Sequence, residues 1–269
     1  MDKSRLNWPA LLETAATVVR SYDTSVTLRQ LFYRLVAAEL LPNTQNAYKA
    51  LSRYTAMARR AGTFPKLMDR TRSIHRYQTF DDPDEARGWL SRIYRRDRTK
   101  SQEHSVYLGV EKHGIVEQLS QWFGDLGIPV LALGGYGSQT YVDNVIEDVE
   151  GQGRAAVLLY AGDFDPSGED IDRDFVERTG CWSDVRRVAL TDQQVEEHGL
   201  PPQPGKATDS RARGFIERHG RLVQVELDAL PPDVLRDLFA AAIEDFWDTS
   251  AYDEVVEEED SERQQLVGS

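Results

Sequence analysis

Hydrophobic positions recur at two different spacings in the two parts of this 269-residue chain. Up to about residue 61 they return every three or four positions, the spacing of amphipathic helices, and this predicts helices at about 8–21, 27–41 and 44–61. After about residue 105, short apolar runs alternate with helical stretches; the runs are SVYLGV, PVLAL, AAVLLYA and VRRVAL. Such alternation is typical of a parallel sheet flanked by helices. The pattern therefore predicts an α/β protein with a helical N-terminal part.

The same pattern predicts four segments. Two helices, a short turn and a basic third helix within residues 1–80 are typical of a helix-turn-helix or winged-helix domain. A linker helix is predicted within residues 81–104, where the polar stretch TKSQEH after the helix marks a boundary, and residues 105–250 hold the predicted sheet with a C-terminal extension. We expect residues 251–269, which are strongly acidic, to form a disordered tail.

Charge changes this picture because it is distributed unevenly. The whole chain has a net charge of −13, yet residues 1–112 carry 20 Lys/Arg against 12 Asp/Glu, and the remaining residues carry 12 against 33. A basic region of this kind attracts phosphate backbones, so double-stranded DNA is the expected partner of the N-terminal part.

The predicted third helix concentrates this charge on one side. Lys49, Arg53 and Arg60 share the face opposite the apolar one, and Arg59 adjoins them. These four residues are the expected DNA-binding side chains of the helix. A basic face that is merely solvated remains open as an alternative.

Membrane insertion and disulfide chemistry are not expected. No run approaches the roughly 18 apolar residues of a membrane span, and the N-terminal segment is amphipathic. We therefore expect a cytoplasmic protein without a membrane partner. The single Cys181 excludes an internal disulfide and a multi-cysteine zinc site.

Two acidic clusters fall at the carboxyl ends of predicted strands. Glu111 ends SVYLGVE, and Asp163 and Asp165 follow AAVLLYAG. Ligands of open α/β sheets gather beyond these strand ends. Three carboxylates brought together repel one another unless a cation intervenes, and oxygen-only ligands suit Mg²⁺. The sequence thus predicts a magnesium site at Glu111, Asp163 and Asp165.

The motif D-x-D-x-S-G at 163–168 has two other interpretations. An EF-hand calcium loop should be entered from a helix and should end in Glu at its twelfth position, but AAVLLYA is strand-like and the twelfth residue is Asp174. The aspartates could instead cap the following helix, which is compatible with metal binding because Ser167 could cap it alone.

The two acidic motifs carry a resemblance to a known family. GVEK at 109–112 and AGDFDPSGEDI at 161–171 resemble the glutamate and D-x-D motifs of a Toprim domain, in the variant found in the topoisomerase VI A subunit and related meiotic double-strand-break transesterases. GGYGSQT at 134–140 loosely resembles the family's glycine-containing loop. The resemblance implies a winged-helix domain followed by a Toprim domain, Mg²⁺ held by the predicted carboxylates, and Lys112 close to a DNA phosphate.

The family also places a tyrosine nucleophile in its winged-helix domain. RQLFY at 29–33 is similar to that motif, which implies that Tyr33 is the nucleophile and that Arg29 and Glu111 assist it. Independently of the resemblance, Tyr33 points roughly 130° away from the apolar stripe of its predicted helix, so the pattern does not predict a core tyrosine. The alternatives are an ordinary amphipathic surface tyrosine and a tyrosine that packs against the following wing.

The resemblance implies a specific activity and partners. It indicates a Mg²⁺-dependent, nucleoid-associated DNA-cleaving transesterase that forms a tyrosyl–DNA intermediate, acts as a homodimer on double-stranded DNA, and works with a separate ATPase subunit. A Toprim-type hydrolytic nuclease and a catalytically inactive DNA-binding protein remain as alternatives.

Overall fold

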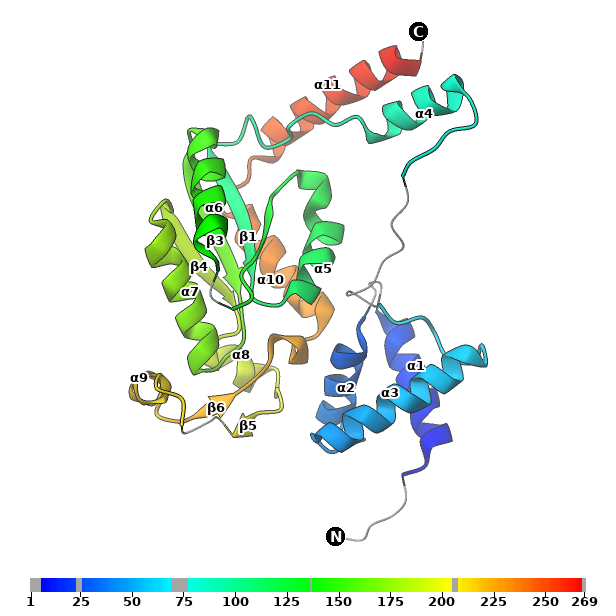
Figure 1. Cartoon of the computed structure of the whole chain (residues 1–269), viewed down its shortest axis with the longest axis vertical. Helices are drawn as coiled ribbons and strands as arrows, with labels where there is room; N and C mark the ends of the chain where they lie inside the picture. The colour runs from blue at the N-terminus through cyan, green and yellow to red at the C-terminus, as the bar shows by residue number, and fades with distance from the viewer. Residues whose placement is uncertain (1–5, 23–25, 69–76, 136, 205–207, 268–269) are drawn as a thin grey trace.

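The chain folds as a mixed α/β protein, seen in a computed structural model that describes residues 6–22, 26–68, 77–135, 137–204 and 208–267 (Figure 1). Its elements in chain order are α1 (Trp8–Ser21), α2 (Leu28–Ala37), α3 (Gln45–Arg60), α4 (Pro83–Ile93), β1 (His104–Val110), α5 (His113–Phe123), the 3-10 helix η1 (Gly124–Leu126), β2 (Val130–Ala132), α6 (Gln139–Gln152), β3 (Ala155–Ala161), α7 (Pro166–Thr179), β4 (Asp184–Ala189), α8 (Asp192–Glu197), β5 (Gln203–Pro204), α9 (Ala212–His219), β6 (Val223–Gln224), the 3-10 helix η2 (Leu227–Ala229), α10 (Pro232–Glu244) and α11 (Thr249–Val267). None of the helices within these ranges has the length and apolar character needed to cross a membrane.

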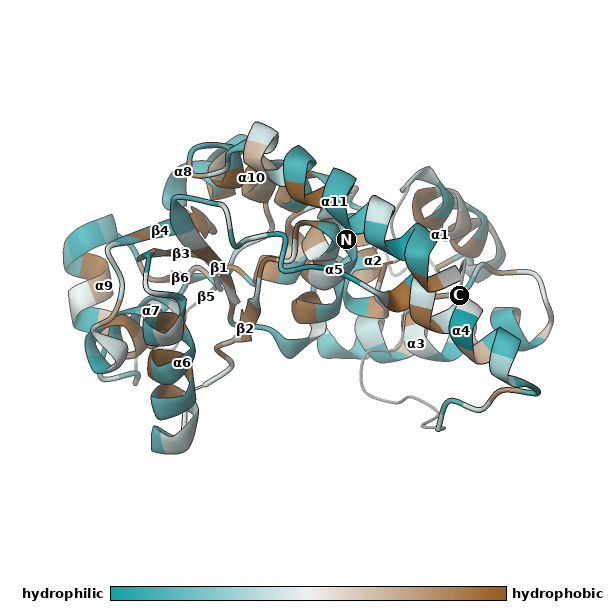
Figure 2. Ribbon diagram, turned by 90° about the horizontal axis from the view of Figure 1, so that it is seen from above, coloured by the Kyte–Doolittle hydropathy of each residue, from teal (hydrophilic) through white to brown (hydrophobic). Residues whose placement is uncertain are grey.

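The central sheet has four parallel strands in the order β2-β1-β3-β4, as the alternation of apolar runs predicts. Side chains along β3 alternate between its faces: Val157 and Leu159 join the core beneath α5 and α10, whereas Leu158 and Tyr160 join the core beneath α6 and α7. The hydrophobic colour in Figure 2 follows the strands of this sheet. Burial on both faces explains why these strands are continuously apolar.

Three helices form the N-terminal unit. Helices α1 and α3 confirm the helices expected at about 8–21 and 44–61, and the side chains of Thr27 and Thr44 cap α2 and α3. Helix α2 is shorter than expected, because the chain leaves the helix after Ala37 and Glu39 adopts a φ of 57°. A wing would follow α3, where residues 69–76 lie outside the described part of the chain.

The N-terminal unit packs against the sheet domain through α2. Inside this contact, Gln30 Nε2 donates a hydrogen bond of 3.1 Å to Gln118 Oε1 on α5, and α2 also contacts η2. The buried side chains of the two parts belong to one continuous cluster. Helix α2, with Arg29 and Tyr33, therefore lies against the segment that follows β6.

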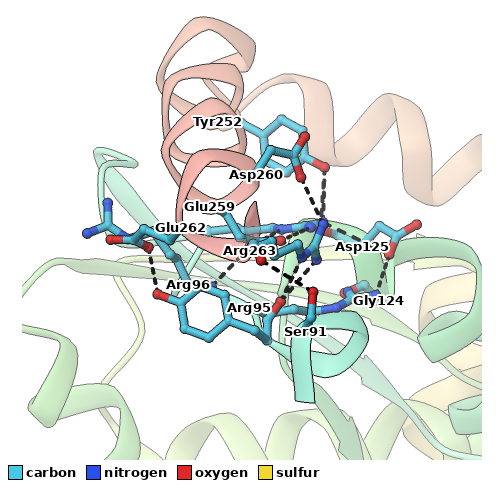
Figure 3. Close-up of polar contacts among 12 residues, drawn as sticks. Ser91, Arg95, Arg96, Gly124, Asp125, Tyr252, Glu259, Asp260, Glu262 and Arg263 are labelled. Carbon is cyan, nitrogen blue, oxygen red and sulfur yellow. Dashed lines mark hydrogen bonds and ion pairs between the residues drawn. The ribbon is translucent and has the colours of Figure 1, made fainter. Parts of the chain in front are cut away.

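The expected disordered tail at 251–269 is corrected by the structure, in which α11 extends over most of it and lies beside α4 (Figure 1). Glu259 is fully buried and accepts hydrogen bonds from Arg98 at 3.0 Å and 2.7 Å. Arg263 donates to the Tyr94 carbonyl oxygen. Figure 3 shows Glu259 and Arg263 within this group of polar contacts. These pairs join residues more than 150 positions apart, so the acidic composition alone could not reveal them. Charge-assisted bidentate bonds stabilise the helix against the linker.

Candidate functional site

The parallel pairing of β1 and β3 brings Glu111 and Asp163 together. Val110 is in register with Ala161, so the residues after both strands meet at one edge of the sheet. The Glu111 amide donates to the Ala161 carbonyl oxygen at 3.1 Å, and the Asp163 amide donates to Glu111 Oε2 at 2.9 Å. The structure thus confirms the expected meeting of these two motifs, which lie 52 residues apart.

Asp165 begins α7, as its N-cap. Its Oδ1 accepts hydrogen bonds from the amides of Ser167 at 2.9 Å and Gly168 at 2.7 Å, and Pro166 occupies the first helical turn. Asp165 therefore caps the helix, and the expectation that Ser167 could serve alone is corrected. Strand β3 enters this loop, which excludes an EF-hand, since that loop follows a helix.

Asp163 is the most enclosed of the three carboxylates, with an exposed fraction of 5%. Its Oδ1 accepts a hydrogen bond from the Leu227 amide at 2.8 Å, and its Oδ2 lies 2.6 Å from Lys112 Nζ. Burial, with the nearby charge of Glu111, raises the pKa of Asp163 to about 7, although Lys112 and the Leu227 amide act against this rise. Burial also raises the pKa of Glu111. Negative charge at this edge is therefore only partly compensated by the chain itself.

The chemistry of these donors fits a hard cation. Within the described ranges, no group of three or more Asp, Glu, His or Cys side chains is gathered tightly enough to hold a metal ion as it stands. The three predicted ligands nevertheless offer only oxygen atoms, and Asp163 and Asp165 are buried. The pKa values of Glu111 and Asp163 are raised, and one side of Asp163 already faces a cation, Lys112. Glu111, Asp163 and Asp165 would be the residues that hold Mg²⁺.

Lys112, which is expected close to a DNA phosphate, contacts two carboxylates of its own chain. Its ammonium bridges Asp163 and, at 3.8 Å, Glu226 Oε2, and 24% of its side chain is exposed. A second basic group, Arg187, holds the loop after β3. It donates hydrogen bonds to the carbonyl oxygens of Asp163 at 2.7 Å and Gly162 at 3.3 Å. Arg187 thus holds the backbone of Asp163, and Lys112 holds its carboxylate.

Gly168 allows α7 to approach this loop closely. A Cβ atom at Gly168 would lie 2.3 Å from the Asp163 carbonyl oxygen and 3.2 Å from Glu111 Oε2. Backbone contacts below 3.0 Å require the chain to shift. The glycine in DPSG thus lets both carboxylates lie against the start of the helix.

Gly168→Ala is expected to lower the free energy of unfolding by about 1–3 kcal/mol, because the added methyl group must displace the Asp163 loop. The matched control is Gly151→Ala in α6, where a Cβ atom meets nothing within 4 Å. That change should raise stability by up to about 1 kcal/mol, the usual gain of alanine over glycine in a helix. Denaturant unfolding of both variants measures the difference, and two changes of the same sign would contradict the close approach.

Tyr33 is buried, contrary to the expectation that it faces away from the core. Its exposed fraction is 4%, because β5 and the segment after β6 cover this side of α2. Gln203 Nε2 lies 3.4 Å from the phenolic oxygen as a donor. The phenol borders a pocket of about 350 Å³ that Arg29, Tyr48 and Glu226 also line. Burial raises the pKa of Tyr33, the carboxylate of Glu226 raises it further, and Arg29 opposes both effects.

Arg29 and Glu226 form the contact between the two predicted motifs. Arg29 Nε lies 3.1 Å from Glu226 Oε2, and Arg29 Nη2 donates to Oε1 at 3.2 Å. Because Glu226 also lies 3.8 Å from Lys112, a chain of charged side chains runs from α2 to Asp163. The structure thus brings Tyr33 and the acidic edge of the same chain to one region.

Sequence reasoning missed Glu226, Gln203 and Arg187. Glu226 lies in the apolar stretch LVQVEL, two residues after the end of β6, much as Glu111 follows the end of β1. That shared position was the available signal. Gln203 and Arg187 carried no signal, since their contacts depend on how β4 and β5 are placed.

The basic side chains of α3 lie where the pattern predicted. Lys49, Arg53, Arg59 and Arg60 are exposed. Arg59 also lines a second pocket, between the N-terminal unit and α5, whose other cationic side chains include Arg29 and Lys112. The exposed basic face is therefore next to the acidic site.

Of the expected glycine-containing loop, Tyr136 lies outside the described residues.

Comparison with known proteins yields no assignment, because no family model matches the chain and no curated protein matches it significantly.

Proposed function

We propose that this chain is a Mg²⁺-dependent DNA-cleaving transesterase in which Tyr33 becomes joined to a DNA end. Its helical N-terminal unit would be the winged-helix domain and its parallel sheet the Toprim domain. The observation that carries the proposal is the chain of contacts from α2, through Arg29, Glu226 and Lys112, to Asp163. Two motifs separated by about 130 positions in the sequence thus adjoin in the fold.

In the proposed reaction the Tyr33 oxygen forms a bond with a backbone phosphorus. The bond between that phosphorus and a deoxyribose oxygen breaks, and the deoxyribose oxygen leaves with the electron pair and takes a proton from solvent. Arg29, at the rim of the pocket, would bind the phosphate through its guanidinium. When bound at Glu111, Asp163 and Asp165, Mg²⁺ supplies positive charge near the phosphate and the leaving oxygen.

DNA would reach the site along the exposed basic face of α3. Arg53, Arg59 and Lys49 lie on that face, and Arg59 lines the pocket that leads towards Lys112. Double-stranded DNA, a homodimer and a separate ATPase subunit belong to the proposal through the resemblance. In this chain, however, Tyr33 shares its pocket with Glu226, which is linked through Lys112 to Asp163 of the same chain, and this supports a site completed by a single chain.

Burial of Tyr33 favours a second candidate, a hydrolytic nuclease in which water attacks at the same metal site. One experiment separates the candidates. Purified protein is incubated with supercoiled plasmid in Mg²⁺ or in EDTA, the reaction is stopped with denaturant, and protein-linked DNA is separated from free nicked DNA. A covalent adduct that requires Mg²⁺ supports the transesterase. Nicked DNA without attached protein supports the nuclease, and intact plasmid supports the inactive DNA-binding protein.

Arg53→Ala is expected to weaken DNA binding by a similar factor for every sequence and to reduce the slope of log K against log salt by about 1, because one phosphate contact is lost. Binding is measured by fluorescence anisotropy over a range of salt concentrations. The control is Arg213→Ala in α9, whose side chain is 90% exposed and paired with Glu217. An unchanged slope for Arg53→Ala would show that the α3 face does not bind DNA.

A further inference from the structure

Glu226 occupies the junction between the predicted nucleophile and the acidic edge of the sheet. It borders the same pocket as Tyr33, and only 15% of its side chain is exposed. The segment that carries it is held in place on both sides, because Val225 pairs with Phe164 and the Leu227 amide donates to Asp163. The position of this carboxylate is therefore set by the same loop that sets the metal site.

One oxygen of Glu226 remains available as a proton acceptor. Its Oε1 accepts a hydrogen bond from Arg29. Its Oε2 is buried and, among the described residues, accepts no hydrogen bond of good geometry, although the cations of Arg29 and Lys112 lie 3.1 Å and 3.8 Å away. A buried carboxylate oxygen without a donor is costly unless a proton or another donor reaches it. The ion pairs with these two cations orient the carboxylate.

The Tyr33 phenol carries an O–H group and lines the same pocket as Glu226. Its oxygen accepts from Gln203 Nε2, which leaves the O–H group directed elsewhere, and the negative charge of Glu226 acts on the phenol across the pocket that both line. The charged groups that face the phenol are Arg29 on its own helix and Glu226 and Asp228 from the segment around η2. Of these two carboxylates, Glu226 is the one that borders the phenol's pocket.

We propose that Glu226 is the general base that accepts the Tyr33 proton as the tyrosyl oxygen bonds to a DNA phosphorus. This inference rests on the proposed transesterase function. The proton passes from the phenolic oxygen to the carboxylate, the oxygen–phosphorus bond forms, and the phosphorus–deoxyribose bond breaks with the electron pair leaving on the deoxyribose oxygen. Such a base removes the need for a preformed phenolate, which burial disfavours in this site.

The test measures the rate of adduct formation by Glu226→Gln, which keeps the shape of the side chain and removes the base. The rate at neutral pH is expected to fall by about 10²-fold or more, and to recover as the pH rises, because hydroxide then removes the proton. Glu244→Gln, at an exposed acid in α10, is the matched control and should retain the wild-type rate. Thermal unfolding of Glu226→Gln and Glu244→Gln shows whether each variant keeps its fold. Glu226→Asp, a shorter carboxylate that keeps the charge, is measured beside them, so that loss of the base is separated from loss of the fold.

A second measurement responds only to a proton-transfer role. Installing 3,5-difluorotyrosine at position 33 makes the phenol more acidic, so the defect of Glu226→Gln should shrink by at least about tenfold. A defect that is unchanged by the fluorinated phenol and by pH would overturn the base assignment and leave a positioning role. Wild-type activity in Glu226→Gln would overturn it while leaving the transesterase standing, whereas no adduct in the wild type would overturn both proposals.

Discussion

Tyr33→Phe is expected to abolish the covalent protein–DNA adduct, a loss of at least about 10³-fold, while DNA binding stays close to that of the wild type. The change removes the one atom that would bond to phosphorus and keeps the buried ring. Its effect on the free energy of unfolding should therefore stay within about 1 kcal/mol. The measurement is the fraction of plasmid that carries protein after a denaturant stop, together with an independent binding assay.

The pocket offers a matched control for this result. Tyr48, on α3, lines the same pocket and packs edge-on against Phe32 with ring centroids 5.3 Å apart. Tyr48→Phe makes the identical chemical change in the same surroundings and should leave adduct formation within a few-fold of wild type. An adduct that persists in Tyr33→Phe and disappears in Tyr48→Phe would reassign the nucleophile. Nicking that survives both changes would favour attack by water.

Asp163→Asn is expected to reduce Mg²⁺-dependent cleavage by at least about 10³-fold, as for Tyr33→Phe. It should also remove the stabilisation that Mg²⁺ provides. A ligand that binds only the folded state stabilises it by about 2.7 kcal/mol at 100 times its Kd. Asp163 has a central place in the acidic edge, where it contacts Lys112 and the loop that carries Glu111. The measurement is the thermal midpoint of each variant in EDTA and in Mg²⁺. Asp143→Asn, at an exposed position in α6, is the control and should keep the full Mg²⁺ effect.

The pH dependence of stability gives a second prediction for the same side chain. Because the pKa of Asp163 rises from its ordinary value of 3.8 to about 7 in the folded chain, its contribution to stability is complete below pH 3.8 and is lost as the pH rises towards 7. Metal-free wild type should therefore lose stability over this interval relative to Asp163→Asn, and Mg²⁺ should reverse the loss. Parallel stability curves for the two proteins in EDTA, or an equal Mg²⁺ effect on both, would count against the metal site.

The strands and the acidic edge are the parts of the fold that could be predicted. Strand β3 coincides with AAVLLYA, and Glu111 and Asp163 adjoin because parallel strands end at the same edge. Helix ends were less accurate: α2 stops at Ala37, since the left-handed backbone at Glu39 ends the helix although its composition remains helical.

Two contacts across long separations explain the main errors. The C-terminal helix was expected to be a disordered tail because acidic residues alone do not bury enough apolar area, but Arg98 neutralises Glu259 and orders it. Tyr33 was expected on an open face because helical periodicity reports only the side facing the unit's own core. The covering residues, Gln203 and Glu226, come from segments about 170 and 190 positions later.

The sequence by itself thus determined the parallel sheet, the basic face of α3 and the meeting of Glu111 with Asp163, because strand periodicity and parallel pairing are local or follow from topology. Only the tertiary structure decided that α2 packs against η2, that Tyr33 is buried beside Glu226, and that Lys112 faces Asp163 rather than open solvent. These outcomes depend on how two separately patterned parts pack together. The buried charges at their contact must find partners across it, and those partners are distant in the sequence.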